Sequence, residues 1–169
     1  TGHAEFTRGA PLVAVDLQTL LKAPTESGKA SELVMQPKST QTIDAVKATR
    51  DSVVVQLLDN VKGAIDIYRR TASGWEASRL GLPLNSALTV RAAQSTGSLI
   101  FVSSESFLEP TRLWAADVVS GKTERVASLP AKFKAGTHAV QQLWATSKDG
   151  TRIPYFLVAP KKMKLDGKT

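Results

Sequence analysis

The 169-residue sequence contains no cysteine, so disulfide bonds and thiolate metal ligands are excluded. Histidine is scarce as well: His3 and His138 are the only two, and neither has the spacing of a metal site or a catalytic triad. The Gly-x-Ser-x-Gly turn that presents a nucleophilic serine in many hydrolases is missing. No apolar run approaches the roughly 18 residues that span a membrane. We therefore expect no catalytic residue, no cofactor, no metal and no membrane partner.

Basic residues outnumber acidic ones, and the formal net charge is +7. A basic balance indicates a nucleic-acid partner only where the charge is concentrated. Lys and Arg are instead spread over most of the chain and are densest in the tail, at Lys161, Lys162, Lys164 and Lys168. We therefore expect a solvated basic surface and no nucleic-acid partner. The lack of cysteine leaves the cellular compartment open.

Short apolar runs alternate with turn-forming residues along the chain. Most runs have four to six residues and are rich in β-branched or aromatic side chains, which favours strands over helices. One short helix is predicted after Asp16, with Leu17, Leu20 and Leu21 on one face. Pro24 would end that helix. The predicted turns are Arg50-Asp51, Asp59-Asn60, Ser73-Gly74, Thr96-Gly97, Ser120-Gly121 and Asp149-Gly150.

The middle of the chain repeats. Arg50-Asp51 precedes Val53-Val54-Val55, and Thr96-Gly97 precedes Leu99-Ile100-Phe101 46 residues later. Each copy holds four strand candidates, which are 43–49, 53–59, 63–70 and 74–80 in the first copy and 87–94, 98–103, 112–119 and 122–129 in the second. Four short strands at a period near 45 are typical of a β-propeller blade.

The predicted fold class is therefore all-β, a partial β-propeller of about two and a half four-stranded blades. Residues 1–40 would supply the outer part of a preceding blade. A propeller needs roughly four to eight blades to close, so we expect the chain to be incomplete and to self-associate through open strand edges. A self-contained β-sandwich is the structural alternative, although sandwiches rarely show so regular a period.

The last segment breaks the repeat. Strands at 141–147 and 152–159 flank Lys148-Asp149-Gly150-Thr151, which predicts a tight hairpin. Pro154 cannot donate a ladder hydrogen bond, so its strand is expected at an edge. The segment Pro130–His138, rich in Pro, Lys, Gly and Ala, has the composition of an interdomain linker.

Two motifs have both a functional and a structural interpretation. Val119-Ser120-Gly121-Lys122-Thr123 ends like a phosphate-binding loop, but position 116 is Ala where that loop requires glycine. Its strand–turn–strand context indicates a Ser-Gly turn between outer strands of a blade. Asp59-Asn60-Val61-Lys62-Gly63 looks like a functional loop, but it also suits a hairpin in which Gly63 is free to adopt a positive φ.

The three tryptophans, Trp75, Trp114 and Trp144, would suit a stacking surface for carbohydrate or nucleic acid. They fall at comparable places in strands, however, which favours packing in the core or between blades. We therefore predict a structural role for all three.

Five segments carry a family resemblance. The most specific is Ser147-Lys148-Asp149-Gly150-Thr151-Arg152-Ile153-Pro154-Tyr155-Phe156. The others are Thr49-Arg50-Asp51, Leu58-Asp59-Asn60-Val61-Lys62-Gly63, Phe107-Leu108-Glu109-Pro110 and Lys164-Leu165-Asp166-Gly167. In colinear order, from about Leu12 onward, they resemble the prolyl oligopeptidase family of serine peptidases, family S9.

The resemblance implies a propeller that filters peptides above an α/β-hydrolase domain. Residues 1–130 would then be the last propeller blades, 131–138 a linker or hinge, and 139–169 the first β-hairpin of the hydrolase domain. The family's catalytic Ser, Asp and His come later in sequence, so the resemblance assigns no catalytic, cofactor-binding or metal residue to this chain.

The expected function is thus a non-catalytic fragment of a peptidase that hydrolyses short peptides after proline through an acyl-enzyme. Its expected partners are the rest of the parent chain and, in the parent, a peptide substrate. The alternative is a β-propeller interaction scaffold without enzymatic activity. A scaffold would continue into another blade after Val140, where this chain breaks its period.

Overall fold

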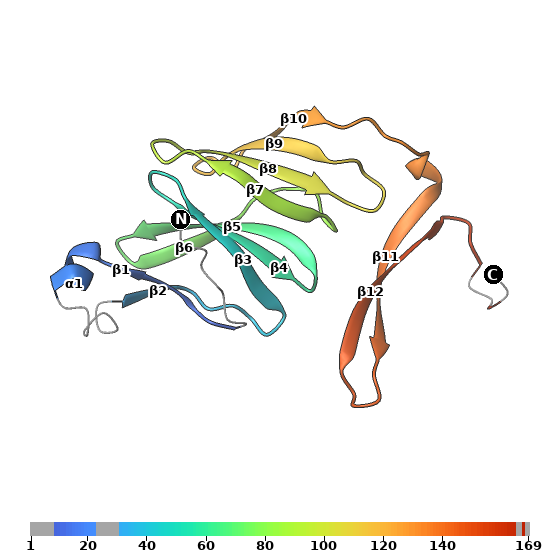
Figure 1. Cartoon of the computed structure of the whole chain (residues 1–169), viewed down its shortest axis with the longest axis horizontal. Coiled ribbons are helices and arrows are strands. Elements are labelled where there is room, and N and C mark those ends of the chain that lie inside the picture. Colours follow the sequence, from blue (N-terminus) through green and yellow to red (C-terminus); the bar gives the residue numbers. More distant parts are fainter. Residues whose placement is uncertain (1–8, 23–30, 165–166, 168–169) are drawn as a thin grey trace.

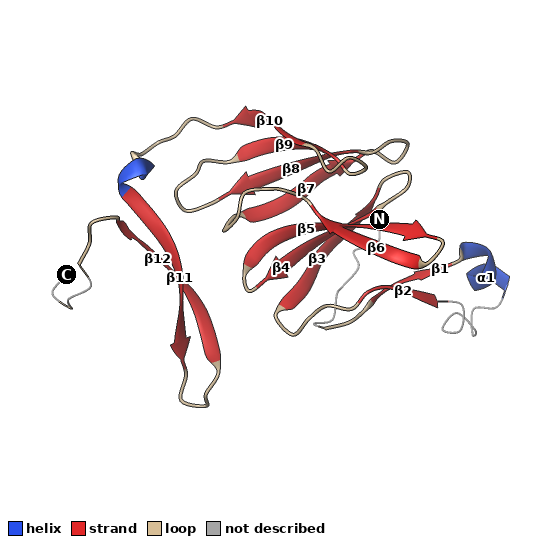
Figure 2. Ribbon diagram, turned by 180° about the vertical axis from the view of Figure 1, so that it is seen from behind, coloured by secondary structure: helices blue, strands red, loops and turns tan. Residues whose placement is uncertain are grey.

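The structure is a computed structural model that describes residues 9–22, 31–164 and 167. Almost all of its regular structure is β, arranged in four antiparallel sheets within these residues (Figures 1 and 2). The predicted all-β class is therefore confirmed. No helix among the described residues is long and apolar enough to cross a membrane.

Two four-stranded sheets form the body of the molecule. The first has the order β3-β4-β5-β6 and consists of β3 (Gln41–Ala48), β4 (Val53–Asp59), β5 (Lys62–Thr71) and β6 (Gly74–Arg79). The second has the order β10-β9-β8-β7 and consists of β7 (Ala87–Ala93), β8 (Leu99–Glu105), β9 (Arg112–Asp117) and β10 (Thr123–Ser128). All eight predicted strands are present, with ends within two residues of those predicted. The repeat in the sequence is therefore a repeat of four-stranded meanders.

A smaller two-stranded sheet precedes these two. It pairs β1 (Leu12–Val15) with β2 (Ser31–Met35), and α1 (Leu17–Lys22) follows β1 directly. The predicted helix is confirmed: the Asp16 carboxylate accepts a hydrogen bond from the backbone N–H of Thr19 at 2.8 Å, which caps the first turn. Its predicted end, Pro24, lies outside the described residues.

A hairpin of β11 (His138–Thr146) and β12 (Arg152–Pro160) follows the second sheet after the short 3-10 helix η2 (Ala135–Thr137). It projects away from the sheets, with its tip pointing outward (Figure 1). The predicted hairpin is confirmed, but β11 begins at His138, inside the predicted linker, because His138 pairs with Pro160 and lengthens the ladder. Within the described residues β12 pairs with β11 alone, so Pro154 does stand on a strand with an open edge.

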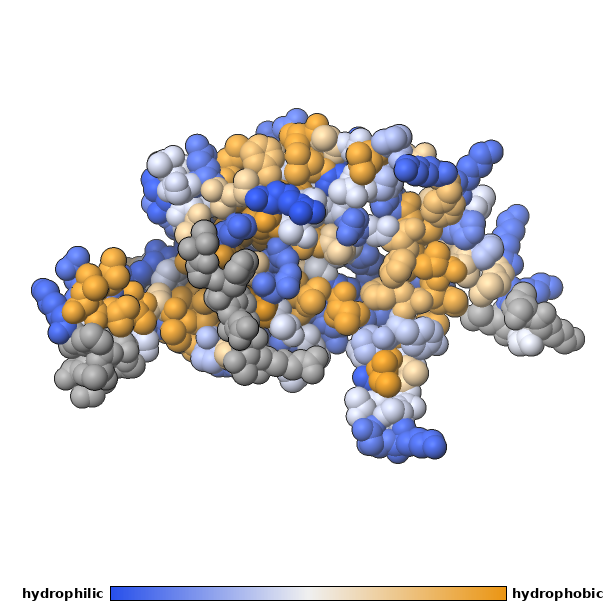
Figure 3. Space-filling model, in the orientation of Figure 1, coloured by the Kyte–Doolittle hydropathy of each residue, from blue (hydrophilic) through white to orange (hydrophobic). Residues whose placement is uncertain are grey.

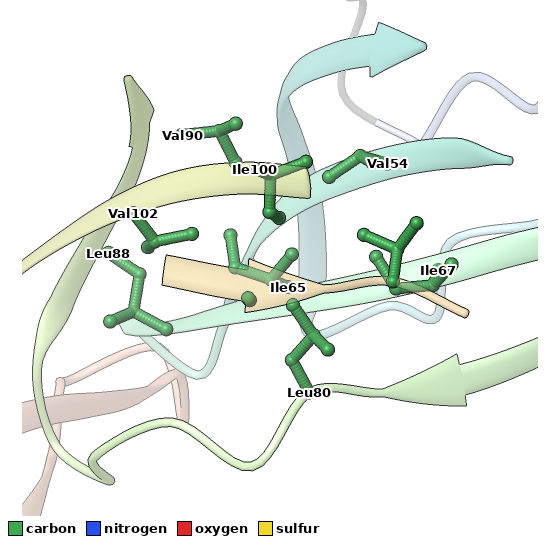
Figure 4. Packing of buried hydrophobic residues seen from close by; sticks show 10 residues of the cluster. Val54, Ile65, Ile67, Leu80, Leu88, Val90, Ile100 and Val102 are labelled. Atoms are coloured by element: carbon green, nitrogen blue, oxygen red, sulfur yellow. The ribbon is translucent and has the colours of Figure 1, made fainter. Parts of the chain in front are cut away.

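Buried side chains form one cluster on each side of the first sheet. The cluster between the two four-stranded sheets combines branched residues of β4 and β5 with residues of the second sheet (Figure 4). Its members are Val54, Ile65, Ile67, Leu80, Leu88, Val90, Ile100, Val102, Ala116 and Val118. The opposite cluster joins the first sheet to β2 and consists of Val34, Met35, Ile43, Val55, Leu57, Ala64 and Tyr68. Because alternate residues of β4 enter different clusters, both faces of the first sheet are covered.

Polar contacts link the two sheets as well. The buried side chain of Gln56 accepts a hydrogen bond from the backbone N–H of Val90 at 2.8 Å, and it donates to Asp44 on β3. Val90 lies beside a β-bulge of β7, which interrupts the ladder with β8 between Val90 and Ala92. The Arg69 guanidinium donates to the carbonyl oxygen of Val118. These contacts connect the sheets at points where strand pairing does not.

Candidate functional site

The hairpin meets the two sheets near the turn between β4 and β5. Asp59 pairs with Lys62, which leaves a two-residue turn of Asn60 and Val61. Both turn residues have positive φ, 49° at Asn60 and 62° at Val61. A positive φ is unusual for a β-branched residue such as Val61, so the turn carries backbone strain.

The prediction for Gly63 is corrected by this geometry. The turn is a hairpin, as predicted, but its positive φ angles fall on Asn60 and Val61. The backbone N–H of Gly63 donates to the carbonyl oxygen of Ser86 at 3.0 Å, at the start of the second sheet. Glycine is thus needed there because two backbones approach closely, a tertiary feature that turn propensity does not reveal.

A polar network holds the end of β4 below this turn. Asp59 accepts hydrogen bonds from Gln41 at 2.9 Å and from Thr40 at 3.3 Å. Arg79 lies 3.8 Å from Asp59 and binds Asp66 through two nitrogens, at 2.7 and 3.0 Å. The hydrogen bonds to Asp66 raise the pKa of Arg79 above its ordinary value, so its positive charge is retained.

Two contacts join the hairpin to the sheets. The side-chain amide of Gln142 on β11 donates to the carbonyl oxygen of Asn60 at 2.9 Å. Phe156 on β12 packs against Phe107, in the loop between β8 and β9, with ring centroids 5.4 Å apart. The first contact reaches the first sheet and the second reaches the second sheet. The hairpin therefore bridges the ends of both.

A cleft of about 460 Å³ lies between these elements. Its walls come from the turn at Val61, the segment before β7, the β8–β9 loop and Phe156. Its acidic residues are Glu105 and Glu109, and none of its lining residues is basic. A second cleft of about 290 Å³ is lined by other residues of the same turn and by Leu84 and Trp144. We take the larger cleft and its surrounding contacts as the candidate functional site.

The tryptophans do not all have the predicted structural role. Trp75 packs against the cluster that contains Val55 and Leu57, as expected. Trp114 is half-buried, and its indole N–H donates to the hydroxyl of Ser104 at 2.8 Å. For Trp144 the prediction of core packing is wrong: its side chain is 40% exposed, with the Arg152 guanidinium 4.7 Å from the ring centroid. Within the described residues the two-stranded hairpin has no sheet against which this face could pack.

The segment 119–123, which ends like a phosphate-binding loop, is a turn, as predicted. Val119 and Ser120 lie between β9 and β10, and Gly121 has a φ of 72°. Asp117 accepts hydrogen bonds from the hydroxyl of Ser98 and from the backbone N–H and hydroxyl of Ser120. These bonds lower the pKa of Asp117 to about 2. The turn is therefore closed by a carboxylate at the place where a phosphate loop would present free N–H groups.

Of the two histidines, the structure describes His138. His138 stacks edge-on against Phe133 with ring centroids 5.6 Å apart, and its Nδ1 lies 3.0 Å from the hydroxyl of Thr137. His3 lies outside the described residues. Among residues 9–22, 31–164 and 167, no three His, Cys, Asp or Glu side chains are grouped to hold a metal ion.

Two consecutive four-stranded antiparallel meanders, packed face to face and related by a sequence repeat, define the chain as a β-propeller segment. Residues 9–128 match the family model described as prolyl oligopeptidase, N-terminal beta-propeller domain. The chain therefore belongs to the prolyl oligopeptidase family, as its sequence motifs predicted.

The relatives are much longer than this chain. It is 40% identical over 163 residues to the uncharacterized peptidase y4nA of Sinorhizobium fredii, covering 96% of this chain and 22% of the relative. It is 22% identical over 142 residues to a prolyl endopeptidase of Elizabethkingia meningoseptica, and the match covers 80% of this chain and 20% of the relative. A solved structure of a post-proline cleaving enzyme from Rickettsia typhi matches with a TM-score of 0.74 at 22% identity. This match covers 91% of this chain and 22% of the enzyme. The chain thus spans about a fifth of the length of the relatives it matches.

Proposed function

We propose that this chain is the propeller part of a longer prolyl oligopeptidase-type serine peptidase and that it has no catalytic residues of its own. In this proposal the longer protein cleaves short peptides after proline, and the sheets control access of those peptides to a catalytic site elsewhere. The observation that carries the proposal is the match of residues 9–128 to the N-terminal beta-propeller domain of the prolyl oligopeptidase family. The names of the prolyl endopeptidase and the post-proline cleaving enzyme support the substrate class.

The proposal divides the chain into blades at 1–130, a linker at 131–138 and the start of a hydrolase domain at 139–169. Two observations support the last assignment. The hairpin follows the residues that match the propeller family, and it does not continue the four-stranded pattern. Both of its strands also have an open edge in the described structure. A lone two-stranded hairpin is marginally stable in water, so further strands of a larger sheet would complete it.

The small number of contacts that attach the hairpin supports the proposed gating role. A hydrogen bond such as that from Gln142 to Asn60 contributes about 1 kcal/mol net. An aromatic pair such as Phe107 and Phe156 contributes about 0.5–1.5 kcal/mol beyond its buried area. Contacts of this size allow a hinge at the linker to open reversibly. The hairpin, with whatever domain it belongs to, would then move relative to the sheets and admit a peptide.

A pair of assays tests the proposal. The 169-residue chain should not hydrolyse a chromogenic Gly-Pro substrate. The full-length product of the gene that contains it should hydrolyse the substrate and be inhibited by a serine-reactive phosphonate. Phosphonate-sensitive turnover by the 169-residue chain, free of host peptidases, would refute the non-catalytic role. A full-length product that binds partners but never cleaves proline-containing peptides would favour the interaction scaffold.

A further inference from the structure

The larger cleft combines segments that are distant in sequence. One wall is the β8–β9 loop with Phe107 and Pro110, and a second is the residue pair Asn85 and Ser86 before β7. Phe156 of the hairpin closes a third side, at the place where it meets Phe107. The volume, about 460 Å³, lies within the range of sites that hold one ligand group or a few residues of a peptide.

The surface of the cleft is largely aromatic and aliphatic. Phe107 is 56% exposed, so much of its ring is free to receive another group. Phe156 and Pro110 add apolar surface on either side of it. The space-filling view shows hydrophobic residues gathered where the hairpin approaches the sheets (Figure 3). A ligand in this cleft must therefore offer an apolar portion.

One carboxylate in the cleft has no cationic partner among the described residues. Glu109 forms an ion pair with Arg112. Glu105 forms none in the described part of the chain, and it accepts a weak hydrogen bond from the hydroxyl of Thr111 at 3.4 Å. The lining residues include neither Lys nor Arg, although the whole chain has a net charge of +7. The cleft is thus a locally negative place on a basic protein.

We propose that this cleft binds the side chain of a lysine or arginine residue of a peptide. The aliphatic stem of such a side chain would lie along Phe107 and Phe156, and its charged head would reach Glu105. The aromatic faces would also attract the cation directly. A purely apolar side chain would fill the cleft but leave the Glu105 charge unpaired, and an acidic side chain would be repelled. The peptide nature of the ligand rests on the proposed function.

Two peptides of equal shape test the charge preference on the 169-residue chain. The first is acetyl-Gly-Pro-Arg-Gly-amide, and the second carries neutral citrulline in place of arginine. Calorimetric titration should show the arginine peptide binding about fivefold more tightly, the size expected of one partly exposed ion pair. Glu105→Gln should reduce that ratio to about one. Glu124→Gln on β10, exposed and outside the cleft, is the matched control and should keep the ratio.

A second measurement does not depend on the folding of a variant. In about 1 M sodium chloride, where the Debye length falls to about 3 Å, the preference of the unaltered chain for arginine should shrink. Equal binding of the two peptides, or a ratio that persists in Glu105→Gln, would overturn the proposal. Because no turnover is measured, either result would leave the peptidase activity of a longer protein standing. An inactive longer protein would conversely refute the function without removing the charge preference.

Discussion

Gly63 on β5 lies so close to the second sheet that a Cβ atom added to it would stand 2.6 Å from the backbone nitrogen of Leu88. The same Cβ would stand 2.6 Å from the carbonyl oxygen of Ser86. Both neighbours are backbone atoms, so neither can rotate away as a flexible side chain would. The close approach therefore sets the distance between the two sheets at the end that faces the hairpin.

The first prediction follows from this contact. Gly63→Ala should destabilise the chain by about 1–3 kcal/mol, because the sheets must separate to admit the methyl group. Gly81→Ala is the matched control, since a Cβ at Gly81 meets nothing within 4 Å. Urea unfolding followed by circular dichroism measures both variants. Equal stability of the two would mean that the sheets do not pack as closely as described.

The second prediction concerns the buried amide between the sheets. Gln56→Met keeps the approximate side-chain volume but leaves the backbone N–H of Val90 without its acceptor. An unsatisfied buried donor costs about 1–3 kcal/mol, so the variant should unfold at lower urea concentration. Gln18→Met on the exposed surface of α1 should have little effect. Unchanged stability of Gln56→Met would show that another group or water satisfies Val90.

The third prediction tests the attachment of the hairpin. Phe156→Ala removes the packing against Phe107, so amide hydrogens of β11 and β12 should exchange faster. Tyr155→Ala is the control because Tyr155 points to the opposite face of the same strand and is 45% exposed. A double-mutant cycle on Phe107 and Phe156 should give a coupling of about 0.5–1.5 kcal/mol. A coupling near zero would show that Phe107 and Phe156 do not hold the hairpin against the second sheet.

The fourth prediction concerns acid. The pKa of Asp117 is lowered to about 2, first by the hydrogen bond from Ser98. Folding thus favours the ionised form, and this stabilisation is fully present above the ordinary pKa of 3.8 and lost as pH falls through about 2. Asp117→Asn should be less stable than the unaltered chain at pH 6 and should lose less of its stability between pH 4 and pH 2.

Thermal melting at a series of pH values measures this effect. Asp149, whose pKa is also lowered to about 2 by Ser147, should keep part of the acid dependence in the variant. Asp51→Asn, at an exposed carboxylate beside Arg50, is the control and should follow the unaltered chain more closely. Parallel curves of melting temperature against pH for Asp117→Asn and the unaltered chain would contradict the stabilisation by ionised Asp117.

The fifth prediction is that the 169-residue chain self-associates. In the described structure the hairpin strands and the outer strands β6 and β10 have unpaired edges, which are templates for another chain. Exposed apolar side chains accompany them, including Val126 at 49% and Ile153 at 48% exposure. Light scattering should therefore show species larger than 18.1 kDa, increasing with concentration. A monomer with a sharp cooperative melt would show that the chain protects its own edges.

Local sequence signals predicted most of the strands and turns. Runs such as Val53–Leu58 are short, β-branched and bounded by turn residues, and this chemistry specifies a strand wherever one face or both faces are buried. Asp16 predicted the start of α1 because its carboxylate can reach the N–H groups of the first turn without any tertiary partner. The repeat and the family motifs are likewise properties of the chain alone.

The candidate site could not be predicted in the same way. Gly63 suggested a turn residue with positive φ, whereas its role depends on the close backbone of Ser86 and Leu88 at the start of the second sheet. Trp144 and Trp75 have the same strand context, yet Trp144 is exposed and Trp75 packs against a cluster. In the described structure the first sheet is covered by β2 on the side of Trp75, whereas the hairpin has no sheet beside Trp144. The cleft brings Phe107 and Phe156 together across 49 residues of sequence, and no local pattern connects them.

The sequence by itself determined the elements, their order, the repeat and the family. The elements depend mainly on residues near one another in the chain, and the repeat and the family motifs are patterns of the sequence itself. The tertiary structure alone decided the spacing of the sheets, the bridge from the hairpin to both of them, and the cleft that places Glu105 near Phe156. The physical reason is that close approach and burial depend on distances between segments far apart in sequence. Those distances exist only once the sheets have packed.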